Sequence, residues 1–221
     1  MLAFMDNTGG PRLEVVASLR GLGDMGIAVS FASEMSGGRA FAHHPEAAFL
    51  VLSPDGRWMR GSLNYTRRED MEADGRCYFF DLVSVEETRK LSLQMIFLGR
   101  LLSRVKSIFI TRGERRALTE EAYKLFSEPD AYKFICWEEN GNLSDIVPVP
   151  QAVFTGMDRI IFAPLPYGED FTDACMGAKG AVLCVNPKMT YVLLAGVLIM
   201  KGVFHIEHVY GEERMIRSDA T

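Results

Sequence analysis

The sequence predicts an α+β protein that is mainly antiparallel β, with a small β-barrel in its second half. Strand-like runs joined by short turns dominate that half, and Asn140-Gly141 between two of them is the strongest short signal for a β-hairpin. A single short helix accompanies these strands, whereas a doubly wound parallel sheet needs a helix after nearly every strand. Near the end, Phe204 and Ile206 alternate with polar residues, as in a strand with one buried face.

The elements of the second half begin with a helix in residues 119–132. Thr119 has the side chain of an N-cap, and Glu120 and Glu121 add acidic groups to the first turn. Strand-like runs then cover 132–138, 142–154, 158–165, 180–185 and 190–209. Turns rich in Gly, Asn or Pro separate most of these runs, which favours antiparallel pairing.

The first half contains strands and one long amphipathic helix. Strand candidates cover residues 26–32, 47–53, 57–65 and 77–83. A helix is expected within residues 86–105, because its apolar side chains recur on one face. These side chains are Leu91, Met95, Leu98, Leu102 and Val105.

A basic stretch, residues 100–116, follows this helix and marks the domain boundary. Its basic residues are Arg100, Arg104, Lys106, Arg112, Arg115 and Arg116, against the single acid Glu114. Such a stretch is more often a solvated helix end and linker than a nucleic-acid patch. We expect an N-terminal α+β domain over 1–112, a barrel over 118–212 and a polar tail over 213–221.

An internal repeat is one interpretation of the two halves. Phe49 and Gly56 align with Phe134 and Gly141 at a constant shift (134 minus 49, or 85 residues). The first half would then be a diverged second copy of the barrel. The identities are few, and two strand-rich domains can align this well by chance, so both interpretations stay open.

Composition is typical of a globular protein and excludes some partners. The chain is 48% hydrophobic and 24% charged, with a net charge of −5, so it has no general attraction to nucleic acid or anionic membranes. Its cysteines have no CxxC spacing and predict reduced, mostly buried thiols. No signal-peptide pattern opens the sequence, and the most apolar run is too short to span a bilayer. We therefore expect a cytoplasmic protein.

Two motifs suggest binding chemistry, but each has a simpler explanation. Gly21, Gly23 and Gly26 fit a dinucleotide-binding pattern, yet no alternating βαβ pattern follows, which favours a glycine-rich turn. The histidines, at 43, 44, 205 and 208, lack metal-ligand spacing backed by a third ligand. The sequence therefore predicts no metal site, and no motif identifies a catalytic residue.

Two prolines in one strand-like run raise a question about its edge. Pro148 and Pro150 lie two residues apart, so the N–H donors that they lack would have pointed to the same side of the strand. A neighbouring strand could not be fully hydrogen-bonded there. We expect a flat ligand or a partner chain along this edge, in preference to plain protection against aggregation.

The order of elements over residues 118–210 resembles the pyridoxamine-phosphate-oxidase-like FMN-binding split-barrel superfamily. The resemblance rests on a glycine turn, a strand that ends in Val-Pro, a third strand, a short helix segment with Thr, and two further strands with a small-residue turn. These correspond to Gly141, Ile146-Val147-Pro148, 159–165, Thr172, 181–185 and Met200-Lys201-Gly202. The resemblance implies a split barrel that binds FMN as a flavin-dependent oxidoreductase or electron carrier.

The same resemblance implies which residues bind the cofactor. The isoalloxazine ring would lie along Val147, Pro148 and Val149, with backbone groups of Phe162 and Ala163 at its polar edge, and Thr172 and Lys179 would hold the phosphate. The segment nearest the phosphate carries Glu169, Asp170 and Asp173, which are unfavourable beside an anion. Either Lys179 or a residue of another segment supplies the positive charge, with residues 88–90 of the first half as one candidate, or the barrel binds no flavin. In the second case it would serve as a ligand-sensing or assembly module.

A homodimer is also expected, or a pseudo-dimer if the two halves pair within one chain. The run of residues 191–200 is more apolar than one face of a small barrel needs to be. The surplus apolar surface should therefore contact a partner.

Overall fold

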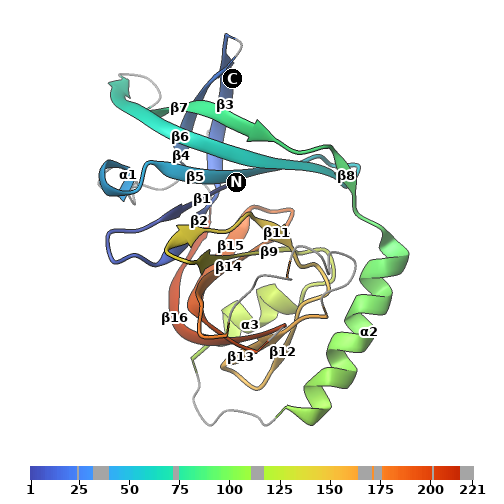
Figure 1. Ribbon diagram of the computed structural model, residues 1–221. Coiled ribbons are helices and arrows are strands. Elements are labelled where there is room, and N and C mark those ends of the chain that lie inside the picture. Colours follow the sequence, from blue (N-terminus) through green and yellow to red (C-terminus); the bar gives the residue numbers. More distant parts are fainter. Residues whose placement is uncertain are drawn as a thin grey trace.

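The computed structural model describes residues 1–23, 25–31, 40–71, 75–110, 117–163, 171, 176–200 and 202–214. The chain forms two eight-stranded sheets, one in each half, and every strand pair is antiparallel. Figure 1 shows the first sheet above the second, which curls into a half-barrel, with the helix α2 descending along its outside. The mainly antiparallel β class is confirmed. Among the helices of the described ranges, none is long and apolar enough to cross a membrane.

The first sheet has the strand order β2-β1-β5-β6-β7-β4-β3, and β8 pairs with β6. Its elements are β1 (Leu2–Met5), β2 (Pro11–Glu14), β3 (Val16–Leu22), β4 (Gly26–Phe31), α1 (Ala40–His43), β5 (Glu46–Leu52), β6 (Arg57–Met71), β7 (Gly75–Val85) and β8 (Arg89–Lys90). The three glycines of the dinucleotide-like pattern lie at the β3–β4 hairpin, where Gly23 has φ of 62°. The pattern is thus a turn, as the simpler explanation predicted.

The second sheet has the order β10-β9-β14-β15-β16-β13-β12, and β11 pairs with β9. Helices α2 (Leu93–Phe109) and α3 (Glu120–Ser127) precede it. Its strands are β9 (Tyr132–Glu139), β10 (Asn142–Leu143), β11 (Val147–Pro148), β12 (Val153–Thr155), β13 (Arg159–Ile161), β14 (Lys179–Val185), β15 (Thr190–Met200) and β16 (Val203–Arg214). Two sequence signals are confirmed. Thr119 Oγ1 accepts a hydrogen bond from Ala122 N and so caps α3. Asn140 and Gly141 both have positive φ in the β9–β10 hairpin.

The main paths of the two sheets have the same strand order once the off-path strands β8 and β11 are left out. β1 and β2 correspond to β9 and β10, β3 and β4 to β12 and β13, and β5 to β7 correspond to β14 to β16. This correspondence relates β5, which begins at Glu46, to β14, which begins at Lys179. The shift of 85 residues expected from Phe49 and Phe134 is therefore wrong, because it aligns β5 with β9 instead of β14.

One hydrophobic core is shared by the two sheets. On β1 and β5, Leu2 and Phe49 belong to an aromatic cluster within the first sheet, together with Phe41 and Phe80. Side chains on the opposite face of the first sheet belong to the larger core of the half-barrel. They are Ala3, Leu13, Ala48, Leu50 and Trp58. Strands β1 and β5 are buried on both faces because alternate residues point to opposite sides.

Helix α2 is what lies along the proline-blocked edge. Arg100 Nε donates to the Pro150 carbonyl at 3.2 Å, and Ser103 Oγ accepts from Ala163 N at 2.8 Å. These bonds join α2 to the proline segment and to the residues after β13, so a helix of the same chain is one neighbour of this edge, where we expected a flat ligand or a partner chain. The expected stripe does not face inward: Gly99 and Ser103 are the buried residues of α2.

The most apolar run folds as a hairpin within the half-barrel. β15 and β16 pair around a turn at Gly202, and Val192, Leu194 and Leu198 are buried. Much of the apolar run at residues 191–200 is therefore covered by this chain, whereas Met200 at its end is 47% exposed. Of the cysteines that are described, Cys136 and Cys184 are buried and Cys77 is half-buried, all with free thiols.

Candidate binding site at the domain junction

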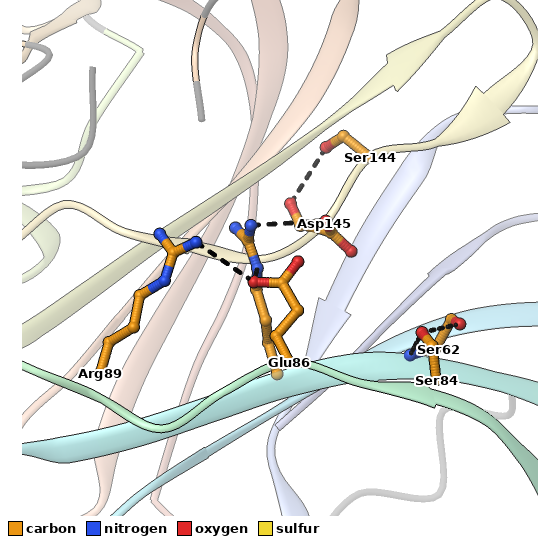
Figure 2. Close-up of polar contacts among 7 residues, drawn as sticks. Ser62, Ser84, Glu86, Arg89, Ser144 and Asp145 are labelled. Carbon is orange, nitrogen blue, oxygen red and sulfur yellow. Dashed lines mark hydrogen bonds and ion pairs between the residues drawn. The ribbon is translucent and has the colours of Figure 1, made fainter. Parts of the chain in front are cut away.

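A buried arginine joins the two sheets. Arg60 on β6 has only 7% of its side chain exposed, and its Nε donates to Glu86 Oε2 at 2.8 Å. Its Nη2 forms an ion pair with Asp145 Oδ2 at 3.6 Å, from the segment between β10 and β11. Glu86 also pairs with Arg89 Nη2 at 3.5 Å (Figure 2). We call Arg60, Glu86, Arg89 and Asp145 the junction cluster.

An indole ring lies beneath both arginines of the cluster. The Arg60 and Arg89 guanidinium carbons are 5.8 and 5.6 Å from the centroid of Trp58. A desolvated cation over a Trp ring contributes on the order of 1–2 kcal/mol. Trp58 is 1% exposed because it packs into the shared core. The guanidinium groups are therefore held between an apolar ring and two carboxylates.

Ser144 fixes the segment that carries Asp145. Ser144 Oγ accepts from Trp137 N at 2.8 Å, and Ser144 N donates to Trp137 O at 2.8 Å. The same hydroxyl donates to the Asp145 carbonyl at 3.1 Å (Figure 2). Since Ser144 is buried and bonded to β9, the backbone that carries the Asp145 side chain has a fixed place opposite the first sheet.

Two cavities border the junction. A groove of about 430 Å³ is lined by Val51, Ser53, Pro54, Asp55, Arg57, Trp58, Met59 and Thr88. This volume lies within the range of ~300–1,000 Å³ that is typical of small-molecule sites. Two of the lining residues connect the groove to the junction cluster: Trp58 lies under its arginines, and Thr88 precedes Arg89. A smaller cleft of about 180 Å³ separates His43 and His44 of the first half from Asn142 of the second. In the described ranges no group of three or more His, Cys, Asp or Glu side chains could hold a metal ion.

The residues expected to bind FMN lie mainly in the core. Val147, Pro148 and Val149 are buried, and β11 pairs with β9 through Val147 and Pro148. The backbone groups of Phe162 and Ala163 are already used: Phe162 N donates to Gly202 O, and Ala163 O accepts from Gln151 Nε2.

Of the two expected phosphate residues, only Lys179 belongs to the described part of the chain. Lys179 is exposed at the start of β14, and Thr172 lies outside the described residues. The alternative phosphate segment, residues 88–90, lies at the domain junction. Its Arg89 belongs to the junction cluster, and Thr88 lines the adjacent groove.

Comparison with known proteins gives two matches among solved structures. No protein-family model matches the chain, and no curated protein matches it. The Bacillus subtilis inhibitor of motility MotI/DgrA matches at 9% identity over 95% of this chain and 87% of that chain, with a TM-score of 0.28. The Borreliella burgdorferi PlzA protein, solved in complex with c-di-GMP, matches at 10% identity over 98% and 82%, with a TM-score of 0.25.

These matches correct the family and the function expected from sequence. They point to proteins other than the pyridoxamine-phosphate-oxidase-like split barrels, so that resemblance is wrong, and so is the flavin-dependent oxidoreductase drawn from it. TM-scores this low lend no argument about a ligand, so a ligand site must be argued from the residues of this chain.

Sequence reasoning missed Arg60, Glu86, Ser144 and Asp145. One local signal was present: Arg60 is two residues after Trp58 on a strand, so a charged side chain shares a face with a core tryptophan. A charge on a buried face needs a partner. The sequence could not reveal that this partner, Asp145, belongs to the other half of the chain.

Proposed function

We propose that this chain is a flavin-free, ligand-sensing protein in which a small phosphate-containing ligand binds at the domain junction and changes the contact between the two halves. The finer fold assignment belongs to the same proposal: each half is a diverged copy of one barrel. The identical strand order of the two sheets supports it. The ligand class that fits best is a nucleotide, with an aromatic base and at least one phosphate.

The observation that carries the proposal is the buried Arg60 between carboxylates of both halves. A guanidinium group binds phosphate through two parallel hydrogen bonds, and Arg60 and Arg89 present two such groups over one indole ring. The groove beside Trp58 has the volume for a base, and its apolar lining residues Val51, Pro54 and Met59 suit the face of one. All three groups therefore match parts of one nucleotide.

Competition for Arg60 would couple binding to domain contact. A phosphate that binds the guanidinium displaces Asp145, which is on the second sheet's side of the junction and 45% exposed. The two halves then lose the ion pair between Asp145 and the buried Arg60. A ligand shifts a conformational equilibrium only by its different affinity for the two states, and this exchange supplies such a difference.

The first ligand to test is cyclic di-GMP, the ligand in the PlzA structure, because its two phosphate groups match the two guanidinium groups of the junction cluster. Titration calorimetry with the full chain would compare it with GTP, GMP and inorganic phosphate. Binding of at least one nucleotide is expected, and Arg60→Ala should weaken it by about tenfold to a hundredfold, the loss of a charge-assisted hydrogen bond.

A matched control distinguishes the effect of losing Arg60 at the site from the effect of losing any arginine. Arg76→Ala removes an exposed arginine at the opposite end of β7, where residue 76 pairs with Asp70. This variant should bind as the wild type does. If no nucleotide binds, or if the Arg60 and Arg76 variants bind alike, the proposed site is wrong.

A further inference from the structure

Helix α2 presents a large unpartnered apolar face. Eight of its side chains are 41–82% exposed: Leu93, Phe97, Leu98, Leu101, Leu102, Val105, Ile108 and Phe109. At 100° per residue they fall within one half of the helix circumference. We call these eight residues the α2 face.

The helix exposes this face because small and polar residues contact the half-barrel. Gly99 and Ser103 are buried against it, and Ser103 Oγ donates to Gly99 O while accepting from Ala163 N. Arg100 fixes the helix further by donating hydrogen bonds to the carbonyls of Pro150 and Pro129. These contacts fix the orientation of α2, so its large side chains cannot turn inward.

The α2 face is larger than a monomer normally exposes. With areas of ~150–210 Å² for whole residues of these types, the exposed fractions of its side chains amount to about 900 Å². The largest apolar patch of a typical monomer is about 300–600 Å², and a stable interface takes about 800 Å² from each partner. The face therefore has the area of one side of a stable dimer.

Its side chains have the spacing of a helix that pairs with a copy of itself. Leu98, Leu101, Val105 and Ile108 are separated by three, four and three residues, which is the spacing of side chains that interlock between two helices at a shallow angle. Next to Ile108 lies a groove of about 820 Å³, which Ile110, Tyr123 and Phe154 also line. The groove adjoins the α2 face and gives a partner helix a place for a large side chain at its end.

We propose that two copies of this chain associate through the α2 face. A two-fold axis makes the same patch serve both copies, so one self-complementary face is sufficient. An anionic membrane is the other surface that an amphipathic helix could meet. The net charge of −5 disfavours it, since such helices use several basic side chains at lipid headgroups. On α2, Arg100 donates to protein carbonyls and Lys106 is half-buried, which leaves Arg104 as the exposed basic side chain of this helix.

Sedimentation velocity of the ligand-free chain tests the proposal, across a wide concentration range. The wild type should sediment as twice 24.7 kDa, and Leu101→Glu and Val105→Glu should each raise the dimer dissociation constant by about a hundredfold or more. Val83→Glu is the matched control, because Val83 is 63% exposed on the first sheet and should leave the dimer intact. Circular dichroism confirms that each variant is folded.

Three results would overturn the proposal. One is a wild-type monomer at every concentration. Another is a dimer that survives both glutamate variants. The third is a monomer that co-sediments with vesicles containing phosphatidylserine and loses this binding in the glutamate variants, which would assign the face to a membrane. The measurement needs no nucleotide, so it is independent of the ligand proposed for the junction.

Discussion

Lys133 is a buried cation whose removal should stabilise the protein. It lies on β9 at 3% exposure, donates to Ala152 O at 3.3 Å and sits 4.8 Å from the Phe126 ring centroid. Burial lowers the pKa of Lys133 from 10.5 to about 8. Keeping this ammonium group charged at neutral pH therefore costs the folded state free energy.

The sign of the pH dependence is set by the lowered pKa. Below about pH 8 both the folded and the unfolded states bind the proton, and the full cost of burial is present. Between about 8 and 10.5 the unfolded state retains a proton that the folded state has lost, so stability rises with pH. A pKa difference of this size corresponds to an upper limit of roughly 3 kcal/mol.

Lys133→Met tests this reasoning because it keeps the length of the side chain and removes the charge. The lost bond to Ala152 O and the ring contact offset part of the gain, which leaves an expected stabilisation of about 1–2 kcal/mol at about pH 7. The advantage over wild type should shrink as the pH rises above about 8. Urea unfolding at several pH values between about 7 and 9.5, followed by tryptophan fluorescence, measures both quantities.

Lys124→Met is the matched control, since Lys124 is exposed on α3 and its removal relieves no buried charge. An advantage for Lys133→Met that stays constant over the whole pH range would refute the assignment of the cost to the buried charge. So would a variant less stable than wild type at neutral pH.

Two further predictions concern packing. Ser103→Ala leaves the Ala163 N–H buried without its acceptor and should cost about 1–3 kcal/mol in urea unfolding, whereas Ser107→Ala, at a hydroxyl that donates within α2, should cost less than about 0.5 kcal/mol. Gly196→Ala would place a Cβ against the carbonyl of His205 across the β15–β16 bulge and should lower stability by about 3 kcal/mol or more. Gly21→Ala, which meets no atom within 4 Å, should cost far less; equal losses for the two glycines would contradict the close approach.

Local signals predicted the elements, because their physical causes are local. A turn with positive φ at Asn140 and Gly141 and a cap at Thr119 depend on a few neighbouring residues, and both were found where expected. The expected run over 142–154 proved to be three short strands instead, since Pro148 and Pro150 cannot donate to a ladder.

Long-range arrangement was the part that could not be predicted from the sequence. The amphipathic pattern predicted the helix and its apolar stripe, but not which side packs against the half-barrel, where Gly99 and Ser103 are the buried residues. The family resemblance failed because short strand and turn motifs recur in unrelated barrels. The ion pair between Arg60 and Asp145 depends on how two sheets meet, and no periodicity within either sheet encodes that.

Competition between a ligand phosphate and Asp145 for Arg60 can be measured with the Asp145→Asn variant. Removing the competing carboxylate while keeping the side-chain shape should tighten nucleotide binding by about tenfold in calorimetry, opposite in sign to Arg60→Ala. If Asp145→Asn instead weakens nucleotide binding or leaves it at the wild-type value, the competition does not occur and the proposed coupling between the ligand and the domain contact is wrong.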